Sequence, residues 1–147
     1  MAMAIDVTDA PHADALKLIE YGVLAFNTSR VGPTGRRPLA AVITNPQTGA
    51  TVGGLAGRTA WSWFYIEWLF VAESLRGQGL AAQAMRQAEA EAIKRGCAGA
   101  WLDTYSFQAR GFYERMGFTV VGQIDGYPPG QTRYFMKKVY AGTASPV

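Results

Sequence analysis

Apolar residues recur along the chain with two different periods. A spacing of three to four residues, typical of one face of a helix, occurs in 13–26, in 80–95 and more briefly in 109–116. Short apolar runs bounded by Gly, Pro or Asn are typical of strands. The strands predicted in this way cover residues 5–7, 39–44, 51–55, 61–71, 98–104, 118–124 and 133–139.

The order of these elements predicts the fold class. Neighbouring strands joined by short turns pair antiparallel, whereas the helix over 80–95 separates two strands and predicts one parallel crossover. We therefore expect an α/β (α+β) architecture in which a mixed, mostly antiparallel central sheet is flanked by helices. No repeat, low-complexity tract or internal linker interrupts the order, so a single domain is expected.

Composition and charge exclude several classes of protein. The 147 residues are 49% hydrophobic and 17% charged, as expected of a globular protein with a substantial core. The single cysteine, Cys97, excludes an intrachain disulfide and argues against a metal site. The net charge of +3 suits an anionic ligand, but the basic residues are scattered, so nucleic acid is not an expected partner. We expect a cytoplasmic protein, because the N-terminus lacks a signal-peptide pattern and no apolar run is long enough to span a membrane.

The most informative segment lies at residues 76–81 and reads Arg-Gly-Gln-Gly-Leu-Ala. A glycine-rich turn between a strand and a helix leaves backbone N–H groups without intrahelical partners, at the positive end of the helix dipole. Such a turn binds phosphate groups. Three interpretations are open: a pyrophosphate-binding turn, part of a dinucleotide-binding pattern, or a turn with a purely structural role.

The dinucleotide pattern Gly-x-Gly-x-x-Gly/Ala is matched by residues 77–82, and Asp103 follows at the distance of a ribose-binding acid. Two features argue against it. Five residues separate Val71, at the end of the preceding strand, from Gly77, whereas a dinucleotide turn directly follows its strand. Only 44 residues follow Asp103, too few for the rest of a doubly wound sheet.

The sequence resembles the GNAT superfamily of acyl-CoA-dependent N-acyltransferases at two points. Residues 76–81 match the family pattern Arg/Gln-x-x-Gly-x-Gly/Ala, and residues 109–118 resemble its later signature, Ala-x-x-Phe/Leu-Tyr-Glu-x-x-Gly-Phe. The order of elements is similar over nearly the whole chain. The resemblance implies one N-acetyltransferase domain over 1–147 that transfers the acetyl group of acetyl-CoA to a primary amine of a small molecule or peptide. The amine would attack directly in a ternary complex.

The resemblance also implies where acetyl-CoA binds. Backbone groups of Phe70 and Val71 would pair with the pantetheine arm, and the Val71 N–H would polarise the acetyl carbonyl. The family usually has Asn three residues before Ala109; this chain has Ser106, whose hydroxyl replaces only one of the two hydrogen bonds of an amide. The implied cofactor-binding residues are Phe70, Val71, Arg76, Gly77, Gln78, Gly79, Leu80, Ala81 and Ser106.

Two catalytic residues are implied in the same way. Tyr113 would be the general acid that protonates the leaving thiolate; the alternative is that it only packs one face of a short helix. Glu67 would be the base, acting directly or through water. Strand alternation places Glu67 on one face with Tyr65, Leu69 and Val71, where aromatic neighbours would partly desolvate it. The alternative is a solvent-facing residue at a sheet edge.

The acceptor side is less well defined. In the family, Phe26, Asn27 and Trp63 would lie near the acceptor and suggest an aromatic-walled pocket for an apolar or cationic amine, although each also fits core packing. Strand edges in this family often pair into homodimers. A non-catalytic CoA-binding regulatory module remains an alternative function, and a dinucleotide-binding oxidoreductase is a weaker one.

Overall fold

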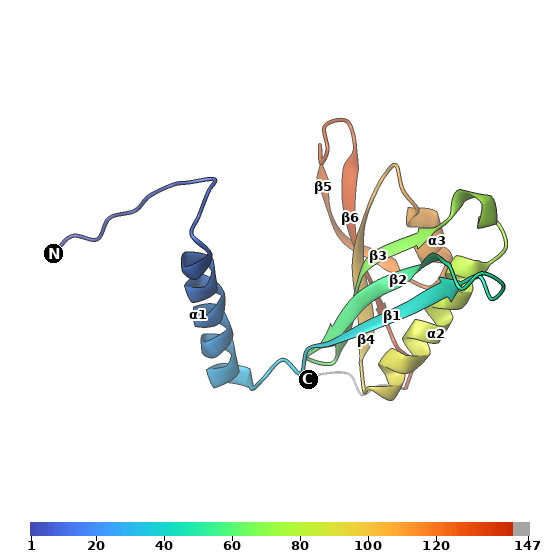
Figure 1. Cartoon of the computed structure of the whole chain (residues 1–147), viewed down its shortest axis with the longest axis horizontal. Helices are drawn as coiled ribbons and strands as arrows, with labels where there is room; N and C mark the ends of the chain where they lie inside the picture. The colour runs from blue at the N-terminus through green and yellow to red at the C-terminus, as the bar shows by residue number, and fades with distance from the viewer. Residues whose placement is uncertain (143–147) are drawn as a thin grey trace. The chain divides into compact units, whose positions relative to one another are not determined.

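A computed structural model describes residues 1–142, and its backbone contacts divide the chain into two units that separate after residue 34. The first unit contains the helix α1 (Ala13–Val31), and the second contains all of the strands (Figure 1). The helix predicted over 13–26 is confirmed and continues to Val31, with Gly32, the first glycine after that stretch, as its C-cap. The strand predicted over 5–7 is wrong, because these residues pair with no strand of the described chain. No helix within the described residues is long and apolar enough to cross a membrane.

The second unit is built on a six-stranded sheet with the order β1-β2-β3-β4-β6-β5. All neighbouring strands pair antiparallel except β3 and β4, which are parallel. The predicted mixed sheet with one parallel crossover is therefore confirmed. The strands are β1 (Arg37–Thr44), β2 (Thr51–Ala60), β3 (Trp63–Val71), β4 (Gly99–Tyr105), β5 (Thr119–Asp125) and β6 (Thr132–Val139).

The second strand is longer than predicted. It continues to Ala60, and Trp61 and Ser62 form the hairpin turn, with φ of 45° and 63°. The sequence assigned Trp61 to the following strand, since neither Trp nor Ser is a usual residue for a turn with positive φ.

The parallel pair β3–β4 opens along its length. The two strands pair only from Trp63–Gly99 to Tyr65–Trp101, although both continue beyond these residues. The helix α2 (Leu80–Lys94) forms the crossover between them, and α3 (Arg110–Arg115) follows β4. The second half of β3 therefore has a free backbone edge on the side of β4.

A β-bulge interrupts β3 at Glu67. The register with β2 shifts between Ala56 and Gly57, so that β3 contains one extra residue at this point. The less exposed positions of β3 have even numbers before the bulge and odd numbers after it. The prediction that Glu67 shares a face with Leu69 and Val71 is therefore wrong, because the bulge reverses the alternation.

The core of the second unit lies between α2 and the sheet. Met85, Ala88 and Ala92, which form the apolar stripe of the helix, are at most 2% exposed. Glu89 is buried on the same helix, and one of its carboxylate oxygens accepts a hydrogen bond from Lys138 Nζ on β6 at 3.1 Å. The buried helix face thus includes one ion pair.

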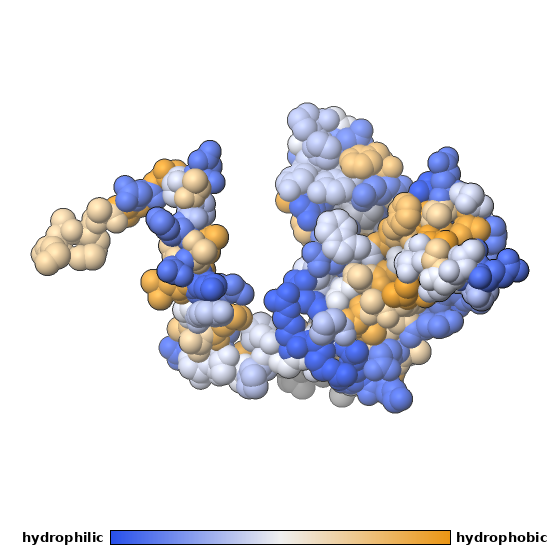
Figure 2. All heavy atoms as spheres, viewed as in Figure 1, coloured by the Kyte–Doolittle hydropathy of each residue, from blue (hydrophilic) through white to orange (hydrophobic). Residues whose placement is uncertain are grey.

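The other face of β1, β2 and β3 remains apolar at the surface of the second unit taken by itself (Figure 2). Val42, Trp68 and Phe70 are each more than half exposed there. Phe70 and Trp68 also border the cavity described next.

Candidate active site

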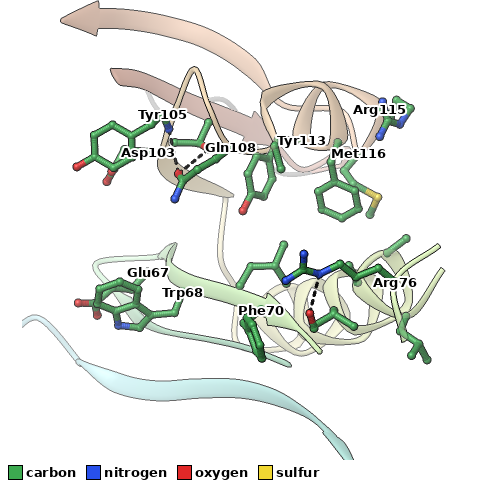
Figure 3. Close-up of a pocket in the computed structure, with 18 of the residues that line it drawn as sticks. Glu67, Trp68, Phe70, Arg76, Asp103, Tyr105, Gln108, Tyr113, Arg115 and Met116 are labelled. Atoms are coloured by element: carbon green, nitrogen blue, oxygen red, sulfur yellow. Dashed lines mark hydrogen bonds between the residues drawn. The ribbon is translucent and has the colours of Figure 1, made fainter. Parts of the chain in front are cut away.

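A cavity of about 1170 Å³ opens where β3 and β4 diverge (Figure 3). Its walls come from the free half of β3, the turn before α2, the end of β4, α3 and one residue of β6. The structure brings most of the predicted site residues together here. Those that line the cavity are Glu67, Phe70, Val71, Arg76, Gly77, Gly79, Leu80, Ala81 and Tyr113.

Of the predicted residues in the second unit, Gln78, Trp63 and Ser106 do not line this cavity. Gln78 lies within the turn, and Trp63 lies at the paired start of β3, where its ring packs over Gly99. Phe26 and Asn27 belong to α1, in the first unit. Their contribution to acceptor binding stays a prediction.

Ser106 is not a lining residue either, because its hydroxyl is used elsewhere. Its Oγ donates to Gln131 Oε1 at 2.6 Å and accepts the Thr132 N–H at 2.9 Å, which ties the end of β4 to β6. Gln108, two residues on, lines the cavity instead, and its Oε1 accepts the Tyr105 N–H at 3.0 Å. The sequence analysis did not single out Gln108. The one local signal is that Gln108 directly precedes Ala109, two residues after the family's usual Asn position.

The turn before α2 has the backbone geometry that the sequence predicts. Gly77 and Gly79 have φ of 82° and 78°, in the left-handed region that favours glycine. A Cβ built on either residue would meet no atom within 4 Å, so the backbone is open to a ligand. Gly79 caps α2 without a side-chain hydrogen bond, which leaves the first N–H groups of the helix available to an anion.

Two guanidinium groups lie on opposite walls at this end of the cavity (Figure 3). Arg76 Nε donates to the Val71 carbonyl at 2.9 Å and so braces the end of β3. Arg115 comes from the end of α3, and its Nη1 folds back over Gly111. Within residues 1–142, neither guanidinium forms an ion pair with a carboxylate. Both positive charges are therefore available to an anionic ligand.

Tyr113 lies between the two ends, and its hydroxyl points into the cavity (Figure 3). The residue is 8% exposed, and the rings of Phe112 and Phe118 contact its ring edge-on. Burial, with a smaller contribution from the negative charge of Asp103, raises the pKa of Tyr113 to about 12. The phenol is therefore protonated at neutral pH.

Two carboxylates line the opposite end. Glu67 is 40% exposed at its side chain, and its Oε2 lies 3.4 Å from Arg58 Nη1. Partial desolvation of Glu67 by aromatic neighbours stays a prediction. The second carboxylate is Asp103 of β4, which is 13% exposed and paired with Arg133. The sequence had pointed to Asp103 only through the dinucleotide pattern. The described residues contain no cluster of His, Cys, Asp and Glu that could hold a metal ion.

The profile of the Acetyltransferase (GNAT) family matches residues 13–118. The chain belongs to this family. The resemblance inferred from the two motifs is thereby confirmed, and the chain is an acetyltransferase. The dinucleotide alternative is wrong: the sheet is mixed, and the short helix η1 (Glu73–Leu75) separates β3 from the turn.

Two relatives have been named for their activity. An acetyltransferase of Agrobacterium fabrum is 41% identical over 132 residues, which cover 90% of this chain and 96% of that protein. Blasticidin-S acetyltransferase of Streptomyces morookaense is 38% identical over 105 residues, 69% of this chain and 77% of that protein.

Solved structures agree with the fold. The crystal structure of an acetyltransferase from Agrobacterium tumefaciens matches with a TM-score of 0.86 and 39% identity, covering 94% of this chain and all of that one. A more distant match is a streptothricin acetyltransferase from Bacillus anthracis, solved in complex with acetyl coenzyme A. Its TM-score is 0.57 and its identity 20%, over 63% of this chain and 58% of that one, so it shows the fold alone.

Proposed function

We propose that this acetyltransferase transfers the acetyl group of acetyl-CoA to a primary amine of a small molecule, by direct attack in a ternary complex. The observation that carries the proposal is the order in which charged and polar groups lie along one cavity. The glycine turn before α2 and two guanidinium groups that have no carboxylate partner within residues 1–142 lie at one end, a protonated phenol lies in the middle, and two carboxylates lie at the other end. The relative that acetylates blasticidin S supports a small-molecule acceptor. The family profile spans both units, which supports one domain over 1–147.

The donor would bind along the free edge of β3. Its pyrophosphate would lie on the N–H groups of the turn at Gly77 and Gly79, with Arg76 and Arg115 supplying positive charge. The pantetheine arm would add to β3 like a further strand, because the backbone groups there lack a partner in β4. The thioester would then lie near Val71, between Glu67 and Tyr113.

Acetyl-CoA is expected to raise the melting temperature of the protein, and NADH is not. At 100 times its Kd, a ligand of the folded state stabilises by about 2.7 kcal/mol, which corresponds to a shift of several degrees in a protein of this size. Differential scanning fluorimetry with both ligands at equal concentration tests this. A shift with NADH and none with acetyl-CoA would exclude the proposed donor.

Glu67 would accept the proton of the incoming ammonium ion, directly or through water. Its exposure suits this role, since a proton released at the site then reaches solvent. Arg58, at 3.4 Å, would orient the carboxylate. The amine must lose its proton before its lone pair can attack the carbonyl carbon of the thioester.

Replacing Glu67 by Gln is expected to lower kcat at neutral pH by about 10²-fold, because the base is lost while the shape is kept. The loss should shrink as the pH approaches the pKa of the amine, where unprotonated amine is already abundant. Steady-state kinetics between pH 7 and pH 10 measure both effects. Glu73→Gln, an exposed carboxylate in η1 outside the cavity, is the matched control and should keep full activity. Equal kinetics for the two variants would remove Glu67 from this role.

A further inference from the structure

The end of the cavity that is lined by Glu67 and Asp103 is the proposed acceptor end, and it contains an ion pair that the proposed reaction does not use. Arg133 Nε donates to Asp103 Oδ1 at 2.9 Å, and Nη2 forms an ion pair with the same oxygen at 2.7 Å. The third nitrogen, Nη1, donates to the Tyr127 hydroxyl at 3.0 Å. Each nitrogen of the guanidinium therefore has an acceptor within the protein.

Aromatic rings hold the same guanidinium in place. Its central carbon lies 5.4 Å from the ring centroid of Tyr105, 5.0 Å from that of Tyr127 and 5.4 Å from that of Phe135. The negative faces of these rings stabilise a cation. The guanidinium of Arg133 is thus held in place by three aromatic rings and one carboxylate within the protein.

Asp103 has more unused hydrogen-bonding capacity than Arg133. Nε and Nη2 of Arg133 both approach Oδ1, and Oδ2 accepts only the Tyr65 hydroxyl at 3.5 Å, the outer limit of a hydrogen bond. A carboxylate oxygen accepts about two good hydrogen bonds. Because Asp103 lines the cavity, Oδ2 has acceptor capacity left for a ligand there.

The charges around Tyr65 favour a positively charged ligand. Two carboxylates, Asp103 and Glu67, line this end of the cavity, and Arg133 supplies the one guanidinium among the residues that line this end. Arg58 pairs with Glu67 and lies 4.7 Å from the ring centroid of Tyr65, but it does not line the cavity. Burial raises the pKa of Tyr65, the negative charges of Asp103 and then Glu67 add to the effect, and the positive charges of Arg58 and Arg133 oppose it. Both carboxylates therefore act on the same small region. The rings of Tyr65 and Trp68 form the adjoining walls.

We propose that Asp103 determines acceptor specificity by binding a second positively charged group of the acceptor, an ammonium or a guanidinium. The amine to be acetylated would lie at Glu67 and the second cation at Asp103 Oδ2, with the rings of Tyr65 and Trp68 between them. This inference rests on the proposed function, because it assumes that the acceptor enters at this end. It predicts a compact dication as substrate, in preference to a monoamine or an amine with a free carboxylate.

Three acceptors of similar length test the proposal: 1,4-diaminobutane, pentylamine and 4-aminobutanoate, whose far ends are cationic, neutral and anionic. The diamine is expected to have the highest kcat/KM. Asp103→Asn should lower that value by about 10- to 100-fold, the range of a charge-assisted hydrogen bond, and lower kcat/KM for pentylamine much less. Asp125→Asn, an exposed carboxylate on β5 outside the cavity, is the matched control and should change neither.

Three outcomes would overturn the assignment. Asp103→Asn lowering diamine and monoamine equally would mean that Asp103 acts through the structure of the site. A diamine preference that survives the substitution would place the second cation elsewhere. A wild-type preference for 4-aminobutanoate would mean that Arg133 recognises a carboxylate. If Asp103→Asn fails to fold, Asp103→Glu carries the test: its longer side chain should move the preference toward 1,3-diaminopropane, and an unmoved preference would contradict the proposal.

A binding measurement separates this inference from the proposed function. N,N,N′,N′-tetramethyl-1,4-diaminobutane is a dication at neutral pH but, as a tertiary amine, does not form a stable amide. Calorimetry in the presence of CoA should show binding that Asp103→Asn weakens about tenfold. Such binding without acetylation of any amine would refute the function and keep the site. Acetylation of amines together with diamine binding that does not depend on Asp103 would support the function and refute the site.

Discussion

Replacing Tyr113 by Phe is expected to lower kcat by about 10²- to 10⁴-fold, the usual contribution of a general acid, and to leave the KM for acetyl-CoA nearly unchanged. The substitution removes only the hydroxyl that points into the cavity. The ring keeps its edge-on contacts with Phe112 and Phe118, so the helix should stay in place. Kinetics with saturating amine separate the two parameters.

The raised pKa of Tyr113 defines what its hydroxyl contributes. A thiol has a pKa near 8.5, so a phenol with a pKa of about 12 holds its proton more tightly than the leaving thiolate attracts it. As a general acid, Tyr113 would therefore pass its proton to the thiolate only while the amine nitrogen returns a proton to the phenol, so that the proton of the thiol comes in net from the amine. Ionisation of Tyr113 should not lower the wild-type rate below about pH 12.

Tyr134→Phe is the control for this experiment, because Tyr134 lies on β6 outside the cavity. It should retain wild-type kcat. Full activity of Tyr113→Phe would show that Tyr113 only packs the helix, and a large rise in KM for acetyl-CoA would indicate a role in binding instead.

Replacing Lys138 by Met is expected to destabilise the fold by about 3 kcal/mol, since it leaves the charge of Glu89 buried without its ion-pair partner. Lys138 Nζ lies 3.1 Å from Glu89 Oε1, and the carboxylate side chain is 6% exposed. Tyr140 contacts the same charge, and burial together with Glu89 raises the pKa of its phenol. For a domain of this size, the melting temperature should fall by roughly 10 °C.

The double variant Glu89→Leu, Lys138→Met should recover most of this loss, because an apolar pair of similar volume carries no desolvation cost. Lys137→Met, an exposed neighbour on β6, serves as the control and should change stability by less than about 0.5 kcal/mol. Denaturant unfolding of all three variants measures the differences. If Lys138→Met and Lys137→Met unfold alike, the ion pair contributes nothing measurable.

Local chemistry explains what could be predicted for the site. The turn at 76–81 needs glycine at two positions of positive φ, and the helix that follows has its apolar residues on one face; both signals lie within a few residues. The same holds for Tyr113, which belongs to a short local motif. The cavity lining confirms that the turn and Tyr113 meet, but their roles in the reaction remain predictions.

Other features depend on strand register, which no local pattern specifies. The bulge at Glu67 exists because β3 has one residue more than the stretch of β2 it pairs with, and the alternation of β3 by itself gave the wrong face. The sequence also did not predict the hairpin turn at Trp61 and Ser62, because these residues are not typical of turns with positive φ.

The sequence by itself determined the family, the order of the α-helices and strands from residue 13 onward and the glycine turn before α2, since periodicity and glycine spacing act over short stretches of chain. Only the tertiary structure decided which side chains share the acceptor end. Glu67, Asp103 and Arg133 are far apart in sequence and come from three strands that lie next to one another as β3, β4 and β6. They line one cavity because the parallel crossover brings β4 beside β3, and because the pairing of these two strands ends early and opens the cavity between them.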